Sequence, residues 1–417
     1  MTRLNPLVLD GSTVKLRLQA DRAVSPDPVH VDWVRFTVQR RNGANLGDID
    51  AVWTDSPQTT DDGQGVPVDE WASQPVGYYA NSTRYEFVMW EIMRNLRELP
   101  GEHHTAAIQA ADLGREVVEC LGPEFRLNPE IRKGHDFYRH RLSILRADVE
   151  VGWIGFLASG DSPRQTAQSA TLHCNLFGAA CTFGQSGWRD KLADVIDQRE
   201  GVVTRVDLAL DYFDGLPGGM AGIVGEYEAG AMDVRGARPA YDQVGRWLES
   251  APCSRSFYFG SKQAGKQTNV YEKGDQLFGP EAHDPWLRVE LRYGNKLRVI
   301  PSDALRRPGD FFAGASDWHA AKLASFASVN PQAVRQTKRL QGQTVEAEVS
   351  RVVRWARQTA GAAIAALARF MPGDGFLDFA HCRTVPGRLQ RFTESDLRGA
   401  FNRLFTPVSA GPALVAG

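Results

Sequence analysis

The sequence predicts an α+β protein with an antiparallel-sheet domain followed by a smaller helical C-terminal region. Polar and apolar residues alternate along residues 205–211 and 286–292, which is the period of a half-buried β-strand. Apolar residues recur at helical spacing along residues 345–370, and Met371-Pro372-Gly373 ends that stripe. A chain of 417 residues, 42% of them hydrophobic, is long enough for two or three domains with a sizeable core.

We expect three parts in the chain. Residues 1–29 are polar and rich in proline and charge, which predicts a poorly ordered lead. Residues 30–300 contain the strand patterns, so we expect them to form the catalytic domain. Residues 301–417 are rich in alanine and helical in pattern, so we place the boundary near residues 301–309.

The local patterns predict the following elements. Strands are expected at 31–38, 138–144, 150–158, 170–176, 205–211 and 286–292, and a hairpin at 256–259 and 267–271 with glycines in its turn. Helices are expected at 82–99, 105–121, 188–198, 220–229 and 241–250, and a long loop at 42–83.

Composition excludes several classes of protein. The five cysteines are scattered without CxxC spacing, which argues against a disulfide framework or a cysteine zinc site and favours a reducing compartment. No run of about 20 apolar residues is present, so we expect no membrane span. The net charge of −2 argues against DNA binding, but residues 288–307 hold six basic side chains against two acids.

The two alternating strands can build a polar site. One strand would place Arg205, Asp207 and Asp211 on a single face, and the other would do so with Arg288, Glu290 and Arg292. Carboxylate oxygens suit hard cations, so Asp207, Asp211 and Glu290 could hold Mg²⁺ or Mn²⁺ if the strands are neighbours. The alternatives are a solvent-facing polar surface and a cross-strand ion pair between Arg205 and Glu290.

A tyrosine lies between these strands in the segment Tyr271-Glu272-Lys273. A tyrosine nucleophile can open a phosphodiester and keep the cut end as a phosphotyrosine. Lys273 would share the tyrosine's face and could hold the phosphate, whereas Glu272 would point away unless the strand ends or bulges there. The alternative for Tyr271 is a packed aromatic. No HxH, HExxH, GxxxxGK[ST] or GxGxxG motif occurs.

Five segments stand out together in the sequence. They are VDWVRFT at 31–37, TRVDLALDYFDG at 204–215, FGSKQAGK at 259–266, VYEKG at 270–274 and LRVELR at 287–292. In this order they resemble the replication initiation factor family, the rolling-circle initiators of filamentous phages and small plasmids. The segments span roughly residues 30–300, and their conjunction is more specific than any one of them. The resemblance implies a nickase that binds an origin, cuts one strand and joins its 5′ phosphate.

The resemblance also implies roles for individual residues. Tyr271 is the expected nucleophile with Lys273 beside it, and Asp207, Glu272 and Glu290, with Asp211 in reserve, are the expected ligands of Mg²⁺ or Mn²⁺. The basic residues expected to contact DNA are Arg205, Lys262, Lys266, Arg288 and Arg292.

The implied partners are double-stranded origin DNA, the nicked single strand, and a host helicase and DNA polymerase in the bacterial cytoplasm; a homodimer is a further expectation. Two alternatives stay open. One is an origin-binding regulator on the same fold that does not cut. The other is a metal-dependent endonuclease that hydrolyses DNA and leaves free 5′ ends.

Overall fold

The structure is a computed structural model that divides into two compact units, residues 1–337 and 338–417. It describes residues 11–42, 99–326 and 332–336, apart from gaps at 26, 161–162 and 249, together with separate residues and short stretches between 92 and 95 and between 345 and 405. No helix in this described part is both long and apolar enough to span a bilayer.

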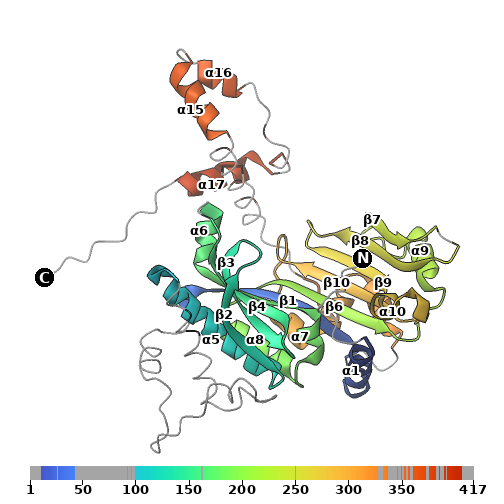
Figure 1. The fold of residues 1–417 in the computed structure, drawn as a ribbon. Helices are drawn as coiled ribbons and strands as arrows, with labels where there is room; N and C mark the ends of the chain where they lie inside the picture. Colours follow the sequence, from blue (N-terminus) through green and yellow to red (C-terminus); the bar gives the residue numbers. More distant parts are fainter. Residues whose placement is uncertain are drawn as a thin grey trace, which may run out of the picture. The chain divides into compact units, whose positions relative to one another are not determined.

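The first unit is built on one ten-stranded antiparallel sheet (Figure 1). Its order is β2-β3-β4-β5-β1-β6-β10-β9-β8-β7, so the earliest strand lies in the middle and pairs with β5 and β6. The strands are β1 (Val29–Gln39), β2 (Phe125–Lys133), β3 (Tyr138–Arg146), β4 (Val149–Ala158), β5 (Thr171–Leu176), β6 (Val202–Tyr212), β7 (Tyr241–Arg246), β8 (Cys253–Ser261), β9 (Lys266–Glu272) and β10 (Leu287–Gly294).

Helices connect the strands and cover one face of the sheet. Helix α5 contacts β2, β3 and β4, α7 and α12 contact β1, and α9 contacts β8 and β9. The helices of this unit are α1 (Gly11–Val24), α5 (His104–Leu121), α6 (Pro163–Ser169), α7 (Gly178–Phe183), α8 (Trp188–Gln198), α9 (Gly219–Glu228), α10 (Lys273–Phe278), α11 (Asp303–Arg306), α12 (Pro308–Ala313) and α13 (Asp317–Ala324), with short 3-10 turns at Arg40–Asn42, Gly101–His103 and Pro280–Ala282.

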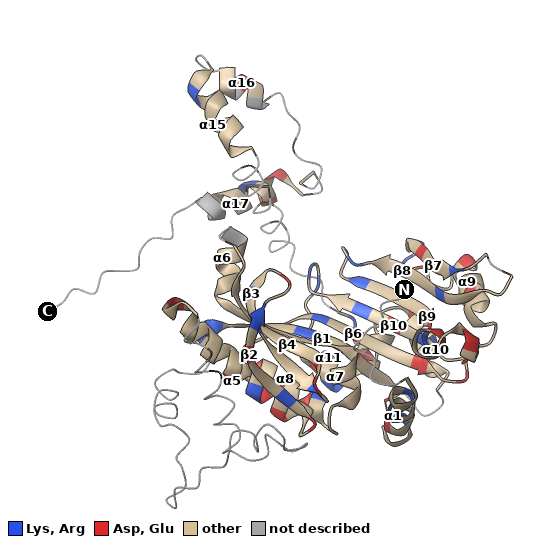
Figure 2. Cartoon of the chain, in the orientation of Figure 1, with Lys and Arg blue, Asp and Glu red and all other residues tan. Residues whose placement is uncertain are grey.

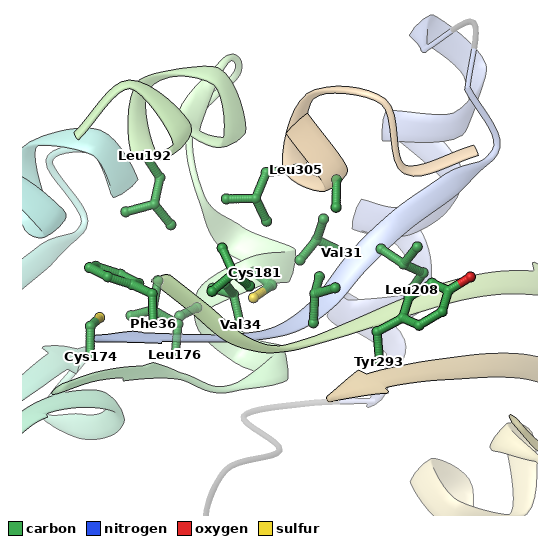
Figure 3. Close-up of a cluster of buried hydrophobic side chains, with 14 of the residues drawn as sticks. Val31, Val34, Phe36, Cys174, Leu176, Cys181, Leu192, Leu208, Tyr293 and Leu305 are labelled. Atoms are coloured by element: carbon green, nitrogen blue, oxygen red, sulfur yellow. The ribbon is translucent and has the colours of Figure 1, made fainter. Parts of the chain in front are cut away.

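The hydrophobic core lies between these helices and the apolar face of the sheet (Figure 3). Val34, Phe36 and Val38 alternate along β1 and are fully buried, as the period of two requires. Helix α5 lies so close to β2 that a Cβ atom at Gly114 would come within 2.8 Å of the Leu127 side chain. The opposite face is therefore left for polar residues.

Most of the expected elements are confirmed, and two expectations are wrong. Residues 11–24 form helix α1 instead of a poorly ordered lead, because Leu18 packs against Phe213 and Trp286. Residues 241–246 form edge strand β7, not a helix; all six are exposed, so no buried face marked them as a strand. Strand β2 was not anticipated. The expected loop at 42–83 and helix at 82–99 lie almost entirely outside the described residues.

The domain boundary also differs from the expected one. Helices α11, α12 and α13 follow residue 301, yet Leu305, Phe312 and Leu323 are fully buried in the core of the first unit. The division therefore falls after Thr337. The second unit has a small core of its own around Val345, Val349, Leu389 and Ala400, and its described helices are α15 (Gly361–Phe370), α16 (Gly375–His381) and α17 (Glu394–Phe405).

Candidate active site

Three neighbouring strands bring the expected site residues to the polar face of the sheet. Strand β10 lies between β6 and β9, and its register places Arg288 opposite both Asp211 and Tyr271. Two residues further, Glu290 lies opposite Ala209 and Asn269, and Arg292 lies opposite Asp207. The strict alternation seen in the sequence is thus a real face, and its polar residues form two adjacent clusters.

The inner cluster, defined as Asp32, Asp211, Trp286 and Arg288, is buried except at Asp32, whose side chain is 15% exposed. The Arg288 guanidinium donates to both Asp211 oxygens at 2.7 and 3.0 Å and to Asp32 Oδ1 at 2.7 Å. Trp286 Nε1 also donates to Asp211 at 2.7 Å. Burial alone would raise the pKa of Asp211, but the charge of Arg288 leaves that pKa below its usual value. The Asp211 carboxylate is therefore ionised and fully engaged.

Asp32 reaches this cluster because β1 bulges there. The register with β6 shifts between Val31 and Trp33, so Asp32 is the extra residue on β1. Burial would raise the pKa of Asp32, yet Arg288 and His30 hold it well below its usual range. Sequence reasoning assigned no role to Asp32. A signal was available, since the buried Val31 and Val34 are three residues apart where strict alternation requires two.

The outer cluster, defined as Asp207, Tyr271, Glu290 and Arg292, lies beside the inner one. The Tyr271 hydroxyl donates to Glu290 Oε2 at 3.2 Å. Arg292 donates to Asp207 at 3.3 Å and to Glu290 Oε1 at 3.4 Å. Asp207 is also bound by Arg205, whose Nε lies 2.9 Å from Oδ1. The tyrosine, two carboxylates and a cation are thus joined through one network.

Electrostatics distinguish the groups of the outer cluster. Burial raises the pKa of Glu290 to about 7, and repulsion from Asp207 and Asp32 adds to the effect. Burial and the nearby Glu290 charge hold the pKa of Tyr271 well above its usual value, so the phenol is protonated at rest. Glu290 can therefore exchange a proton near neutral pH, and it already accepts the tyrosine's hydrogen bond.

Lys273 lies at the edge of the outer cluster, where β9 ends and α10 begins. Its Nζ donates to Gln276 Oε1 at 2.8 Å and lies 5.7 Å from the centre of the Tyr271 ring. Burial and the charge of Arg288 lower the pKa of Lys273 to about 8. The lysine can carry its charge close to the tyrosine at neutral pH.

Two of the expected site residues, Glu272 and Arg288, are placed elsewhere, and a third, Lys266, already donates to the backbone. Glu272 ends β9 on the opposite face, where it accepts from Arg255 Nη2 at 2.6 Å and from the Arg255 backbone at 2.7 Å. Arg288 is only 1% exposed and serves the inner cluster, so it is not available to DNA. Lys266 donates to the Ala315 carbonyl at 2.6 Å. The expected grouping of Glu272 with the metal ligands, and of Arg288 with the DNA contacts, is therefore not found.

The remaining acids fit a divalent cation in their chemistry. Asp32, Asp207 and Glu290 offer carboxylate oxygens, which are the ligands that hard divalent cations prefer. Within the described residues no three such ligands are already grouped as a coordination shell, and the acids pair with arginines. A cation bound here would take over part of the charge compensation that the arginines supply.

The fold and the site define an α+β protein whose antiparallel sheet holds a buried tyrosine against carboxylates. Residues 201–378 match the model of the family described as replication initiation factor. The match starts just before β6 and includes β9 and β10, the strands that carry the outer cluster, and it confirms the resemblance indicated by the sequence. Replication initiation is thus the general role that the family match supports.

The comparisons with solved structures and with curated proteins do not extend the family match. One similar solved structure is the rolling circle replication initiator protein from Geobacillus stearothermophilus, which is 14% identical. The alignment covers 74% of this chain and 99% of that chain with a TM-score of 0.39, a likeness that carries no argument. The search of curated proteins finds no match.

Proposed function

We propose that the protein starts rolling-circle replication by nicking one strand of its origin and remaining joined to the 5′ phosphate through Tyr271. The observation that carries the proposal is the hydrogen bond from the Tyr271 hydroxyl to Glu290, a carboxylate whose pKa of about 7 suits a proton acceptor. A packed tyrosine also finds a hydrogen-bond partner when it is buried, but a partner carboxylate with a strongly raised pKa is typical of functional sites.

The reaction is a transfer of one phosphodiester from deoxyribose to tyrosine. The Tyr271 oxygen forms a bond to phosphorus while the bond from phosphorus to the 3′ oxygen breaks. The phenol proton passes to Glu290, and the departing 3′ oxygen takes a proton from water. The products are a 5′-phosphotyrosine and a free 3′ hydroxyl, so the energy of the ester is kept for rejoining.

Neighbouring groups make the proton transfer possible. Ionised Glu290 accepts the proton that the raised pKa of Tyr271 would otherwise retain. Arg292, which bridges Asp207 and Glu290, is a cation available to the phosphate as its charge develops. Lys273 supplies a second positive charge beside the tyrosine ring.

Asp32 and Asp207 are the residues that would hold Mg²⁺ or Mn²⁺ while Glu290 accepts the proton, and the cation would act there as a Lewis acid toward the phosphate. Asp211 is less suited, because both of its oxygens already accept from Arg288. The free 3′ hydroxyl would then be extended by a host DNA polymerase as a helicase opens the duplex.

The test is to incubate the protein with Mg²⁺ or Mn²⁺ and supercoiled DNA of its own replicon, then to look on a denaturing gel for protein joined to a nicked strand. We expect an adduct with the wild type and none with Tyr271→Phe. Tyr258→Phe is the matched control, because Tyr258 pairs with Asn269 on the neighbouring strand and should still form the adduct.

Other outcomes identify other functions. Nicking without an adduct would indicate a hydrolytic endonuclease, whereas binding without nicking would indicate an origin-binding regulator. An adduct that survives Tyr271→Phe would place the nucleophile on a different tyrosine.

A further inference from the structure

A basic groove of about 680 Å³ lies on the sheet next to the outer cluster. It runs between the β2–β3 turn and the β8–β9 turn, across strands β5, β1, β6 and β10, and the Lys and Arg positions of these strands are marked blue in Figure 2. Its lining holds six basic side chains and one acid, Asp136. The basic residues are Arg35, Arg205, Lys262, Lys266, Arg292 and Lys296.

One wall of the groove carries an aromatic residue, Phe137, whose backbone is in a strained conformation. Phe137 has a φ of 71° and is 66% exposed, and Asp136 before it has a φ of 51°. A bulky residue rarely adopts this left-handed conformation, and an exposed phenyl ring gains nothing from it through burial. The strain is therefore maintained by the surroundings.

Contacts on both sides fix the turn that holds Phe137. The Asp136 carboxylate accepts from Arg35 at 2.9 Å, and the Phe137 carbonyl accepts from the Ser159 backbone at 2.8 Å. Tyr138 is buried, stacks on the His173 ring at 5.5 Å and shares a hydrogen bond with Thr171. A rigid turn thus holds one apolar ring at the side of a cationic groove.

We infer that Phe137 is a stacking platform for a base of single-stranded DNA, whose phosphates the groove binds. Unpaired bases can stack on an aromatic ring, whereas the bases of a duplex are stacked on each other, so the platform favours a single strand. The exposed Lys262 and Lys296, together with Arg35, supply the charge that attracts the phosphates. This inference rests on the proposed function, because it describes how the strand to be cut is held.

The groove leads directly to the proposed nucleophile. Arg292 lines the groove and is also part of the outer cluster. Glu290 lies two residues away on the same face of β10, about 7 Å along the strand. A strand bound across Arg292 is therefore delivered to the carboxylate that accepts from Tyr271.

The test measures the binding of a labelled 12-nucleotide single strand and of the same sequence as a duplex, by fluorescence anisotropy without divalent metal. Phe137→Gly removes both the ring and the backbone strain, so this variant should fold at least as stably as the wild type. We expect it to bind the single strand roughly 5- to 100-fold more weakly and the duplex less than about twofold more weakly. Phe137→Trp should retain single-strand binding.

Leu248→Ala is the control for loss of an exposed apolar side chain, because Leu248 is fully exposed and follows edge strand β7. It should leave both affinities unchanged. The inference is wrong if Phe137→Gly binds the single strand as the wild type does, or if both affinities fall by the same factor. Because no cutting occurs in this assay, the platform and the adduct of Tyr271 can fail independently of each other.

Discussion

The inner and outer clusters contain the same kinds of side chain within one sheet, yet they differ in how completely the charges are satisfied. Arg288 and Asp211 are both almost fully buried and make two mutual hydrogen bonds at 2.7 and 3.0 Å. In the outer cluster Arg292 is 29% exposed, and its bonds to Asp207 and Glu290 are 3.3 and 3.4 Å long. The Arg288–Asp211 pair is therefore closed to ligands. The bonds of Arg292 are long enough that a ligand can replace them.

This difference separates the parts that build the site from those that act in it. The buried Arg288–Asp211 pair joins β6 to β10, and both Asp211 oxygens already accept hydrogen bonds, which leaves little room for a substrate or metal. A network with a protonatable acid and long bonds can change partners when a phosphate or a cation arrives. Loss of Arg288 or Asp211 should therefore affect mainly stability, and loss of a residue of the outer cluster should affect mainly activity.

The largest effect is expected from Tyr271→Phe in the outer cluster. The variant loses the proposed nucleophile but keeps the ring, so adduct formation should fall by at least about a thousandfold. The free energy of unfolding should fall by no more than about 1 kcal/mol, since the only bond lost is that to Glu290. Rates from timed gels and a urea titration measure the two quantities. A large loss of stability would make the tyrosine structural.

In the inner cluster, Arg288→Met should act mainly on stability. It leaves Asp211 and Asp32 buried without their cation, which costs about 3–5 kcal/mol. Urea unfolding of this variant and of Lys262→Met, an exposed control, measures the difference. The comparison between the clusters fails if Arg288→Met unfolds like the wild type.

Glu290→Gln tests the pH dependence of the outer cluster. Folding raises the pKa of Glu290 from 4.5 to about 7, so its ionisation weakens the fold as pH rises through that window. A rise in pKa of this size corresponds to roughly 3 kcal/mol of stability. The stability difference between Glu290→Gln and the wild type should therefore grow in favour of the variant from pH 5 to pH 8.

The same substitution affects the chemistry. In the wild type, adduct formation should increase with pH through about 7 as Glu290 becomes able to accept the tyrosine proton. Glu290→Gln should reduce the rate roughly a hundredfold and remove this rise. An unchanged pH profile would mean that the proton leaves by another route.

The smallest effect is expected from Glu272→Gln. The residue lies on the opposite face with Arg255, so the rate of adduct formation should change by less than about twofold. Stability should fall by about 1 kcal/mol through the weakened pairing. The rate of adduct formation is measured on the same gels. A loss of activity without a loss of stability would indicate that Glu272 is a metal ligand after all.

The parts of this site that alternate regularly could be predicted from the sequence. The faces of β6 and β10 follow from the period of two, and the tyrosine at the end of β9 follows from the family resemblance. The strand order could not be predicted, because pairing depends on the whole core. The spacing of Val31 and Val34 hints at the bulge beside Asp32, but its partner Arg288 lies 256 residues away, so the local pattern could not give its role.

The central position of β1 has a consequence for how the protein is made. Its partners β5 and β6 begin at residues 171 and 202, so β1 leaves the ribosome on the order of ten seconds before it can pair. Asp32 has no Arg288 partner until β10 has been synthesised. A nascent or truncated chain that ends before β10 therefore has no complete site, so the site forms only when the sheet is complete.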